Sequence, residues 1–341
     1  MSTCVAGIDL HKNHSYVTVM GKDGQILGEE NLESKAEPIL TYLGKFGKPE
    51  VVFEATRNWY WLYEALQREG YDVTMAHPKK TKAIGEAKIK TDKIDSHTLA
   101  HLKRSDLIPE SYLAPLKTRQ RRELLRHRVF LVRERAKLKS KVRNLLSKLN
   151  LNCPYSNVLG KEAIGWLREK GEDMPQVFTD KLDDLLELGV GLTEIIGEVE
   201  TRIGEEADED EVVKLLDTIP GIGQFSAMVI KAEIGTIDRF PDADHLASYC
   251  GLVPSVSSSG NYTHRGSITK EGNRWLRWIL VEAAGKVKKK SSHFNDFYLR
   301  IQKKKTKQVA RVATARKLAV AIYYIWKRRE PFKEPEQRST G

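Results

Sequence analysis

CVAGIDLHKNHSYVTVMGKDGQILGEENL, residues 4–32, decides the fold of the first part of this chain. The stretch contains three short β-rich runs, at 4–10, 14–20 and 26–32, and the turn residues GKDGQ separate the last two. Runs this short and this closely spaced predict an antiparallel meander, because parallel strands need a long crossover between them.

Helices and strands alternate in the residues that follow. The pattern predicts a helix at 37–46, a strand at 50–55, a helix at 59–69, a strand at 72–77, and then a helix that opens in KTDKIDSHTLA, residues 90–100. The order β-β-β-α-β-α-β predicts an α/β sheet that combines the meander with parallel crossovers.

The middle of the chain has a helical period. Apolar residues recur at spacings of three and four from Leu125 to Leu149, and again from Leu182 to Ile203. This predicts two long amphipathic helices, either an antiparallel coiled coil that bridges two domains or a small helical bundle with no interaction role.

A third region starts near Val212. LLDTIPGIGQFSAMVIKAEIG, residues 215–235, predicts two apolar helices joined by a glycine turn. Such a turn either presents N–H groups to a phosphate or is a packing corner, and the basic chain around it favours phosphate. We expect a Ser/Gly-rich loop after residue 248, then a helix, and then basic C-terminal helices.

The composition indicates a soluble globular protein with a polyanionic partner. The net charge is +11, which suggests nucleic acid or an acidic membrane surface. The longest apolar run, Leu318–Trp326, is too short to span a bilayer, and the N-terminus lacks signal-peptide features. Three cysteines without a CxxC pair predict neither a disulfide framework nor a cysteine zinc site, so a reducing cytoplasm fits best.

Charge is unevenly distributed along the chain. Residues 117–148 carry 13 Lys/Arg and 2 acids, residues 286–329 carry 15 and 1, and residues 194–211 between them carry 9 acids and 1 Arg. Solvated helix faces explain part of this pattern. Two basic blocks separated by an acidic one predict two nucleic-acid surfaces joined by a spacer.

Four acids stand at positions that the predicted fold brings together. Asp92 and Asp95 share one helix face, where they repel unless a cation lies between them, although Asp is also common at an ordinary helix start. Asp9 and Glu54 end two apolar strands, where a carboxylate is costly to bury unless it is paired or bound to metal. Together the four indicate a site for Mg²⁺ or Mn²⁺, which could activate a water or steady a scissile phosphate.

The motifs resemble a known family. GIDLHKN, FEATRNWYW and KTDKIDSHTLA are similar, in this order, to the RuvC-like half of the DEDD transposases of the bacterial IS-110 insertion-sequence family. IPGIGQFSA, YCGLVPSVSSSG, RGSITKEGNRWLR and RVATARKLAVAIYYIWKRREPF resemble its second half. The resemblance covers nearly the whole chain.

The resemblance implies three regions. These are a RuvC-like α/β domain with an RNase H fold at 1–110, a helical coiled-coil region at 111–211, and a mainly α serine transposase domain with a helix-hairpin-helix-like element at 212–341. It also implies a DNA transposase, or site-specific recombinase, of an insertion sequence. Its partners would be donor and target DNA, a structured non-coding bridge RNA that guides it, and other copies of the chain in a homo-oligomer, expected to be a tetramer, with no membrane partner.

The family's functional residues fall on named positions of this chain. Its four acids correspond to Asp9, Glu54, Asp92 and Asp95, and its nucleophilic serine corresponds to Ser259. The resemblance implies a covalent phosphoserine intermediate at Ser259, in a composite site where the two domains meet across protomers.

The loop around the serine departs from the family pattern. Ser257 and Ser258 precede Ser259, so a neighbouring hydroxyl could react, and a triple serine beside Gly260 is also typical of a flexible loop. A serine that attacks phosphate needs a base, for which Asp92 or Asp95 would be suitable, and cations to balance the charge. The candidate phosphate contacts are Arg265, Lys270, Arg274 and Arg277.

Two other functions fit the same residues. One is a metal-dependent RuvC-like nuclease or junction resolvase, in which Ser259 is only a loop residue. The other is a nucleic-acid-binding protein without chemistry. A covalent protein–DNA adduct distinguishes the recombinase from both.

Overall fold

The computed structural model describes residues 4–55, 58–84, 91–259 and 262–335 of the chain. It divides into two compact units, Met1–Leu113 and Ala114–Gly341, each with a hydrophobic core of its own. The second unit therefore begins just before a long helix that starts at Leu116.

A five-stranded sheet forms the centre of the first unit, in the order β3-β2-β1-β4-β5. β1, β2 and β3 pair antiparallel, whereas β4 pairs parallel with β1 and β5 pairs parallel with β4. The strands span β1 Cys4–Leu10, β2 His14–Gly21, β3 Ile26–Glu33, β4 Glu50–Glu54 and β5 Val73–Ala76. This confirms the mixed sheet that the sequence predicts.

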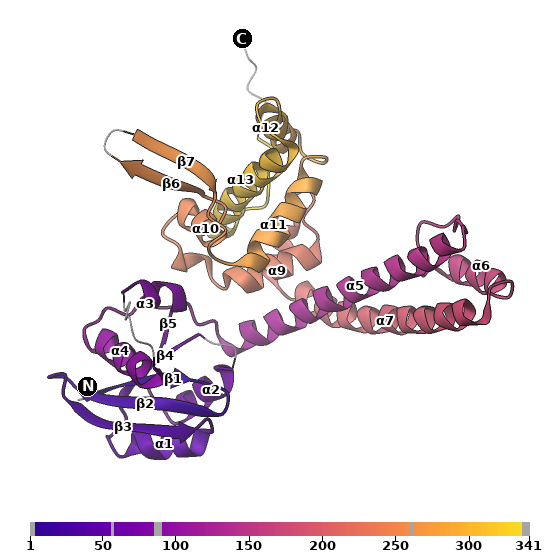
Figure 1. The fold of residues 1–341 in the computed structure, drawn as a ribbon. Coiled ribbons are helices and arrows are strands. Elements are labelled where there is room, and N and C mark those ends of the chain that lie inside the picture. Colours follow the sequence, from indigo (N-terminus) through magenta and orange to yellow (C-terminus); the bar gives the residue numbers. More distant parts are fainter. Residues whose placement is uncertain (1–3, 56–57, 85–90, 260–261, 336–341) are drawn as a thin grey trace, which may run out of the picture. The chain divides into compact units, whose positions relative to one another are not determined.

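The alternation of side chains along β1 assigns the helices to the two faces of this sheet. Ala6 and Ile8 face the core that α1 and α2 cover. Val5 and Gly7 point the other way, where α4 packs along β1, β2 and β4. α4 therefore covers the face of β1 that also carries Asp9 (Figure 1). The helices of this unit are α1 Ala36–Gly44, α2 Tyr60–Arg68, α3 Pro78–Ile84 and α4 Asp92–Arg104.

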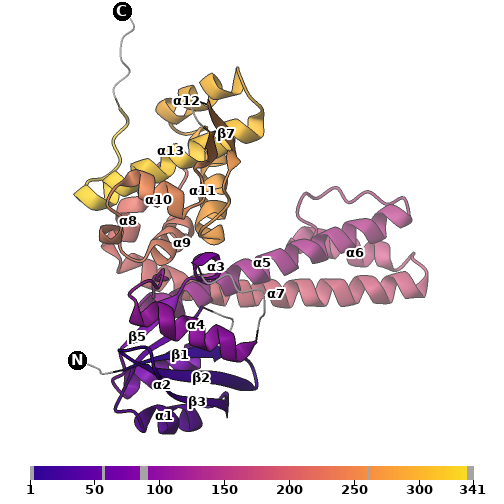
Figure 2. The same ribbon diagram turned by 60° about the vertical axis from the view of Figure 1, so that its left-hand side comes forward.

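Two long helices open the second unit. α5 (Leu116–Lys148) and α7 (Gln176–Asp208) run side by side in Figures 1 and 2, with α6 (Lys161–Gly171) near the turn between them. Val142 and Leu186 belong to the apolar core that these helices share. The sequence predicts both long helices but not α6, which lies in a stretch bounded by turn residues such as Pro154 and Pro175.

The acidic block has a different role from the one predicted. Arg121 on α5 donates to Glu206 at 2.8 Å and to Asp210 at 3.1 Å, and Arg128 donates from Nε to Glu200 at 2.9 Å. Glu200 and Glu206 of α7, and Asp210 just after it, pair with the first basic block, because α5 and α7 are packed together. Part of the acidic block thus neutralises arginines of α5, which the prediction of a simple spacer did not include, and the two predicted nucleic-acid surfaces stay a prediction.

The remainder of the second unit is mainly helical. Its largest core joins residues from α5 and α7 to residues of the C-terminal helices. The elements are α8 Glu211–Asp217, α9 Gln224–Ile234, the 3-10 helix η1 Ile237–Arg239, α10 Ala243–Tyr249, β6 Pro254–Ser259, β7 Tyr262–Ile268, α11 Arg274–Val287, α12 Ser292–Gln302 and α13 Lys307–Arg328.

The segment predicted as a Ser/Gly-rich loop is instead a two-stranded antiparallel hairpin. β6 and β7 pair from Pro254 opposite Ile268 to Ser259 opposite Tyr262. The sequence conceals this because serine and glycine favour turns, whereas the ladder of backbone hydrogen bonds depends little on side chains. The expectation of an irregular loop is therefore corrected.

The glycine turn between α8 and α9 has a packing reason. Gly221 adopts φ +90°, and a Cβ at this position would lie 2.7 Å from the backbone nitrogen of Val287. Only glycine permits both the left-handed backbone and this close approach. The phosphate contact expected at this turn stays a prediction.

Across the described ranges, every helix is too short or too polar to cross a lipid bilayer.

Candidate metal centre

The parallel pairing of β1 and β4 places two acids at the same edge of the sheet. Ile8 lies opposite Phe53 in the register. Asp9 and Glu54 are the next residues, so they lie side by side at the carboxyl ends of β1 and β4. Asp9 is partly buried, with 19% of its side chain exposed. This is the convergence that the strand order predicts.

The other two acids come from the first turn of α4. Thr91 caps the helix, because its hydroxyl accepts a hydrogen bond from the Ile94 N–H at 3.2 Å. Asp92 is the first residue of the helix and Asp95 lies one turn on. Both carboxylates also complement the positive end of the helix dipole, which is the ordinary reason for Asp at a helix start.

A glycine sets how closely α4 approaches the sheet. A Cβ at Gly7 would lie 2.1 Å from the carbonyl oxygen of Ser96 and 2.6 Å from the nitrogen of Ala100. The backbones of β1 and α4 are therefore nearly in contact. A buried hydrogen bond of 2.8 Å between the hydroxyls of Thr18 and Ser96 fixes the same interface.

These elements together form one cavity of about 540 Å³. All four predicted acids line it, from two strand ends and one helix start. Its lining consists of Asp9, Leu10, His11, Lys12, Glu54, Asn58, Thr91, Asp92 and Asp95. The structure thus brings together the complete predicted carboxylate set.

His11 is a residue of this site that the sequence argument missed. Its Nε2 lies 3.0 Å from Asp9 Oδ2 and 3.4 Å from Asp92 Oδ1, and the candidate ligand atoms of these three side chains lie within 4.8 Å of one another. The His11 carbonyl accepts hydrogen bonds from Ser34 Oγ at 2.8 Å and Asn58 Nδ2 at 3.1 Å, which fix its backbone. The signal was its place two residues after Asp9, where a residue that continues an extended chain points to the same side.

The electrostatics of the cavity show how crowded its negative charge is. Burial raises the pKa of Asp9; His11 lowers it, and Asp92 and Asp95 raise it, so the net shift is upward. Burial lowers the pKa of His11, but the carboxylates of Asp9 and Asp92 outweigh burial and raise it overall. The site therefore favours a positive charge at its centre, and in this structure His11 is placed to supply one.

The donor set fits a hard divalent cation. Carboxylate oxygens are the ligands that Mg²⁺ prefers, and two or more of them commonly hold it together with water. The cavity has four carboxylates and room for water beside an ion. His11 Nε2 already contacts Asp9 Oδ2 and Asp92 Oδ1, so it positions these two carboxylates and would bind an ion itself only in place of those contacts.

The predicted nucleophile lies in the second unit. Ser259 is the last residue of β6 and pairs with Tyr262 of β7. Gly260 lies outside the described residues, as do the side chains of Ser257, Ser258 and Ser259. The hairpin thus places the backbone of Ser259 at its tip.

The four candidate phosphate contacts have different surroundings. Arg265 lies in β7 opposite Val256, and its side chain is outside the described part of the chain. Lys270 is exposed, with φ +54°. Arg274, the first residue of α11, is exposed, whereas Arg277 donates to the carbonyl of Cys250 at 3.1 Å. Arg277 thus has a structural bond that the sequence did not reveal.

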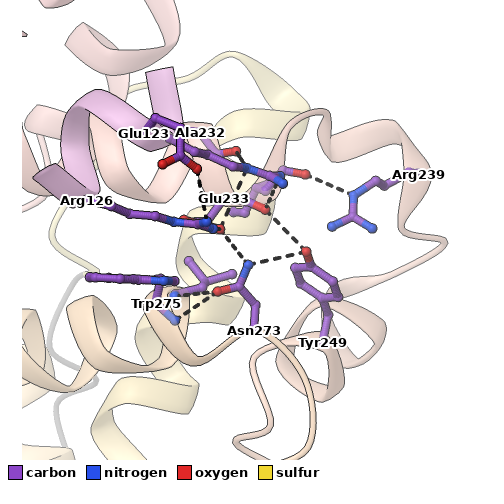
Figure 3. Close-up of polar contacts among 11 residues, drawn as sticks. Glu123, Arg126, Ala232, Glu233, Arg239, Tyr249, Asn273 and Trp275 are labelled. Atoms are coloured by element: carbon purple, nitrogen blue, oxygen red, sulfur yellow. Dashed lines mark hydrogen bonds and ion pairs between the residues drawn. The ribbon is translucent and has the colours of Figure 1, made fainter. Parts of the chain in front are cut away.

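A buried carboxylate fixes the base of the hairpin. Glu233 in α9 is 2% exposed and accepts from Arg126 Nη2 at 2.9 Å and from Asn273 Nδ2 at 2.7 Å (Figure 3). Asn273 in turn caps α11, since its Oδ1 accepts from the N–H groups of Trp275 and Leu276, both at 2.9 Å. Glu233 therefore ties α5 to the start of α11.

The same network reaches the strand side of the hairpin. The Asn273 N–H donates to the carbonyl of Tyr249 at 2.8 Å, and the Thr269 N–H donates to the carbonyl of Val253 at 2.9 Å. Residues just before β6 are thus bonded to residues just after β7. The sequence argument missed Glu233, because nothing in AEIG distinguishes a buried acid from an exposed one.

Comparison with known proteins agrees with this geometry. A family model described as "Transposase" of the DEDD IS110 type matches residues 6–151, which include all four acids. A second model, "Transposase IS116/IS110/IS902 family", matches residues 213–299, which include the serine hairpin. The chain belongs to the IS110 family of DEDD transposases. The mixed sheet and the helical second unit of this IS110-family protein fit a RuvC-like transposase.

Two of the relatives to which the chain is similar are named transposases, and a third is named for the inversion of a gene. A putative transposase of Sinorhizobium fredii is 25% identical over 82% of this chain and 70% of its own length. The transposase for insertion sequence element IS1111A of Coxiella burnetii is 25% identical over 83% of this chain and 79% of its own. A pilin gene-inverting protein of Moraxella bovis is 37% identical over 35% of this chain and 38% of its own. The resemblance to the IS-110 family inferred from the motifs is confirmed.

Proposed function

We propose that this IS110-family protein cuts and rejoins DNA strands to move an insertion sequence, and that its RuvC-like unit works with Mg²⁺ or Mn²⁺. The observation that carries the proposal is the convergence of four carboxylates on one cavity at the carboxyl ends of β1 and β4. Four acids around one cavity repel one another, and a bound cation relieves that repulsion.

The chain's own residues divide the work in this site. Asp9, Glu54, Asp92 and Asp95 would hold the ion, which supplies charge stabilisation at a scissile phosphate and an acidified water. Asn58 and Ser34 fix the His11 backbone, and His11 orients the carboxylates of Asp9 and Asp92. Thr91 and Gly7 set the position of α4 and with it two of the acids.

Ligand removal tests the metal proposal. Asp9→Asn and Asp92→Asn should each weaken Mn²⁺ binding by at least about tenfold and abolish recombination, while the fold persists. Binding is measured by calorimetric titration of the purified protein, and folding by circular dichroism. Asp72→Asn, at an exposed acid away from the cavity, is the control. Unchanged binding and activity in both ligand variants would rule out the carboxylate site.

We further propose that Ser259 is the nucleophile. Its hydroxyl oxygen forms a bond to the scissile phosphorus, the bond from phosphorus to one deoxyribose oxygen breaks, and the serine proton passes to that oxygen by way of a base. Rejoining reverses these steps. The match of the second family model to the hairpin region and the fixed base of the hairpin support the proposal.

A trapped adduct tests the nucleophile. A DNA substrate nicked near the cut site should leave the protein covalently linked to a DNA end, because the strand needed for rejoining diffuses away. Denaturing electrophoresis shows the adduct. Ser259→Ala should abolish it, whereas Ser257→Ala and Ser258→Ala should retain it, because in-line attack tolerates little misplacement. If the wild-type protein forms no adduct but cleaves the DNA to free ends only when metal is present, the protein is the RuvC-like nuclease or junction resolvase instead.

The remaining parts of the proposal concern regions and partners. We propose a RuvC-like region at 1–110, a coiled-coil region at 111–211 and a serine transposase region with a helix-hairpin-helix-like element at 212–341. We also propose a bacterial, nucleoid-associated protein that works as a tetramer on donor and target DNA with a structured bridge RNA as guide. The basic residues of α5 and of the C-terminal helices support nucleic-acid binding.

Competition tests the RNA guide. Binding to the element's own non-coding RNA should weaken steeply with salt, yet an unrelated RNA of equal length should compete poorly. If an unrelated RNA competes equally well, the binding is non-specific charge attraction. The protein would then be a nucleic-acid-binding protein without guided chemistry.

A further inference from the structure

The C-terminal helices of the second unit enclose a cavity that no step above uses. α11 and α12 both pack against α13 (Figure 2). Residues of the three helices line a cavity of about 450 Å³. Four cations line it: Lys286 and Lys288 at the end of α11, and Lys307 and Arg311 at the start of α13. It is separate in sequence from all four phosphate contacts that the sequence predicts.

Arg311 is held in a fixed position in this cavity. Its Nε donates to the carbonyl of Val281 at 2.8 Å, and its Nη2 lies 3.1 Å from Glu282 Oε1. A Cβ at Gly285 would lie 3.2 Å from the guanidinium, so the side chain lies flat on a glycine. A pre-positioned guanidinium loses little entropy when it binds an anion.

The charge balance of the cavity favours an anion. Glu282 is the single acid in its lining, and it is already paired with Arg311. The Lys288 ammonium lies 3.6 Å from the centre of the Tyr298 ring, which fixes it without neutralising it. Lys286 and Lys307 are exposed, and neither forms an ion pair with another residue that the structure describes. The lining therefore carries a net positive charge at neutral pH.

We propose that this cavity binds the phosphodiester backbone of a nucleic-acid strand, an inference that rests on the proposed nucleic-acid function of the protein. A planar Arg and several Lys are the usual partners of phosphate. The cavity volume lies in the range of sites that hold a small molecule, which is enough for a phosphate group with a flanking sugar. DNA and RNA share this phosphodiester chemistry, so both are candidates for the strand.

Salt dependence of binding tests the proposal. The full-length double variant Lys286→Ala/Lys307→Ala is compared with Lys289→Ala/Lys290→Ala, which removes the same charge from exposed residues outside the cavity lining. The probes are fluorescently labelled 20-nucleotide single-stranded DNA, single-stranded RNA and duplex DNA of one sequence. Fluorescence anisotropy gives the dissociation constant over a series of NaCl concentrations.

The two outcomes are distinct. Loss of two phosphate contacts should reduce the slope of log affinity against log salt by about 1.4 for single strands or about 1.8 for duplex, and the control should change it less. The arm in which this occurs identifies the strand as DNA or RNA. If the two double variants change the slope equally in every arm, the cavity is not a phosphate site.

The adduct assay separates this proposal from the proposed function. If Lys286→Ala/Lys307→Ala leaves the salt slope unaltered while the wild-type protein forms the serine adduct, only the proposed phosphate site in the cavity is overturned. If the cavity variant reduces the salt slope although the wild-type protein forms no adduct, the serine nucleophile is overturned and the phosphate site in the cavity is supported.

Discussion

Loss of the buried Glu233 carboxylate should destabilise the second unit strongly. Glu233→Ala leaves the guanidinium of Arg126 without its buried partner and removes the acceptor of Asn273 Nδ2. The Glu233 side chain is 3% exposed, so solvent replaces little of what is lost. Breaking a fully buried ion pair by removing one partner costs about 3–5 kcal/mol of unfolding free energy. Because the Arg126 side chain is 30% exposed and water can reach it, we expect a smaller loss, of about 2–3 kcal/mol.

The same arginine offers a matched control. Glu123 lies 3.8 Å from Arg126 Nη1 but is 66% exposed, so Glu123→Ala should cost less than about 0.5 kcal/mol. Hydrogen–deuterium exchange, read on peptides from α9 and α11, gives the opening free energy of this unit for each variant. If Glu233→Ala loses less than about 1 kcal/mol, or no more than Glu123→Ala, then burial does not set the strength of this network and the reasoning is wrong.

Two further predictions concern a close contact and a titration. Gly7→Ala should weaken Mn²⁺ binding in calorimetric titration although no ligand is changed, because the new Cβ on β1 would lie 2.1 Å from the Ser96 carbonyl oxygen and α4 must move away from the strand, whereas Gly44→Ala, which has nothing within 4 Å, should not. Burial raises the pKa of Asp210, but Lys231, the Val213 N–H and Arg121 outweigh it, so its pKa is lowered in the folded protein. The stabilisation of the folded protein by ionised Asp210 is therefore complete above the unfolded pKa of about 3.9. It is lost as the pH falls through the lower pKa that Asp210 has in the folded protein. The stability gap between wild type and Asp210→Asn in urea unfolding should accordingly shrink with acidification, and a constant gap would contradict the assignment.

The serine hairpin and the charge blocks show where reasoning from sequence fails. PSVSSSG has the composition of a loop, but the backbone of Pro254–Ser259 forms a ladder with β7 whose register no side-chain pattern specifies. The acidic block has the composition of a spacer, yet Glu200 and Glu206 pair with arginines of α5. The arginine partners of the acidic block lie 72 and 85 residues away, so local composition carries no information about them. The partner strand of the hairpin is near in sequence, but a ladder of backbone hydrogen bonds depends little on which side chains it carries.

The sequence by itself determined the sheet and the candidate ligands of the first unit. Short apolar runs bounded by turn residues fix the strands. The carboxyl ends of neighbouring parallel strands lie at the same edge of the sheet, so the sequence alone places Asp9 and Glu54 near each other there. The first-turn acids of α4 followed from the ordinary signals of a helix start.

Only the tertiary structure decided which side chains complete the sites. His11 turns toward Asp9 and Asp92 because its carbonyl is bonded to Ser34 and Asn58, and those bonds join segments far apart in the chain. Glu233 is buried because α5, α9 and α11 meet around it. Burial and long-range hydrogen bonds depend on the packing of distant segments, whereas period and composition describe only what is near in sequence.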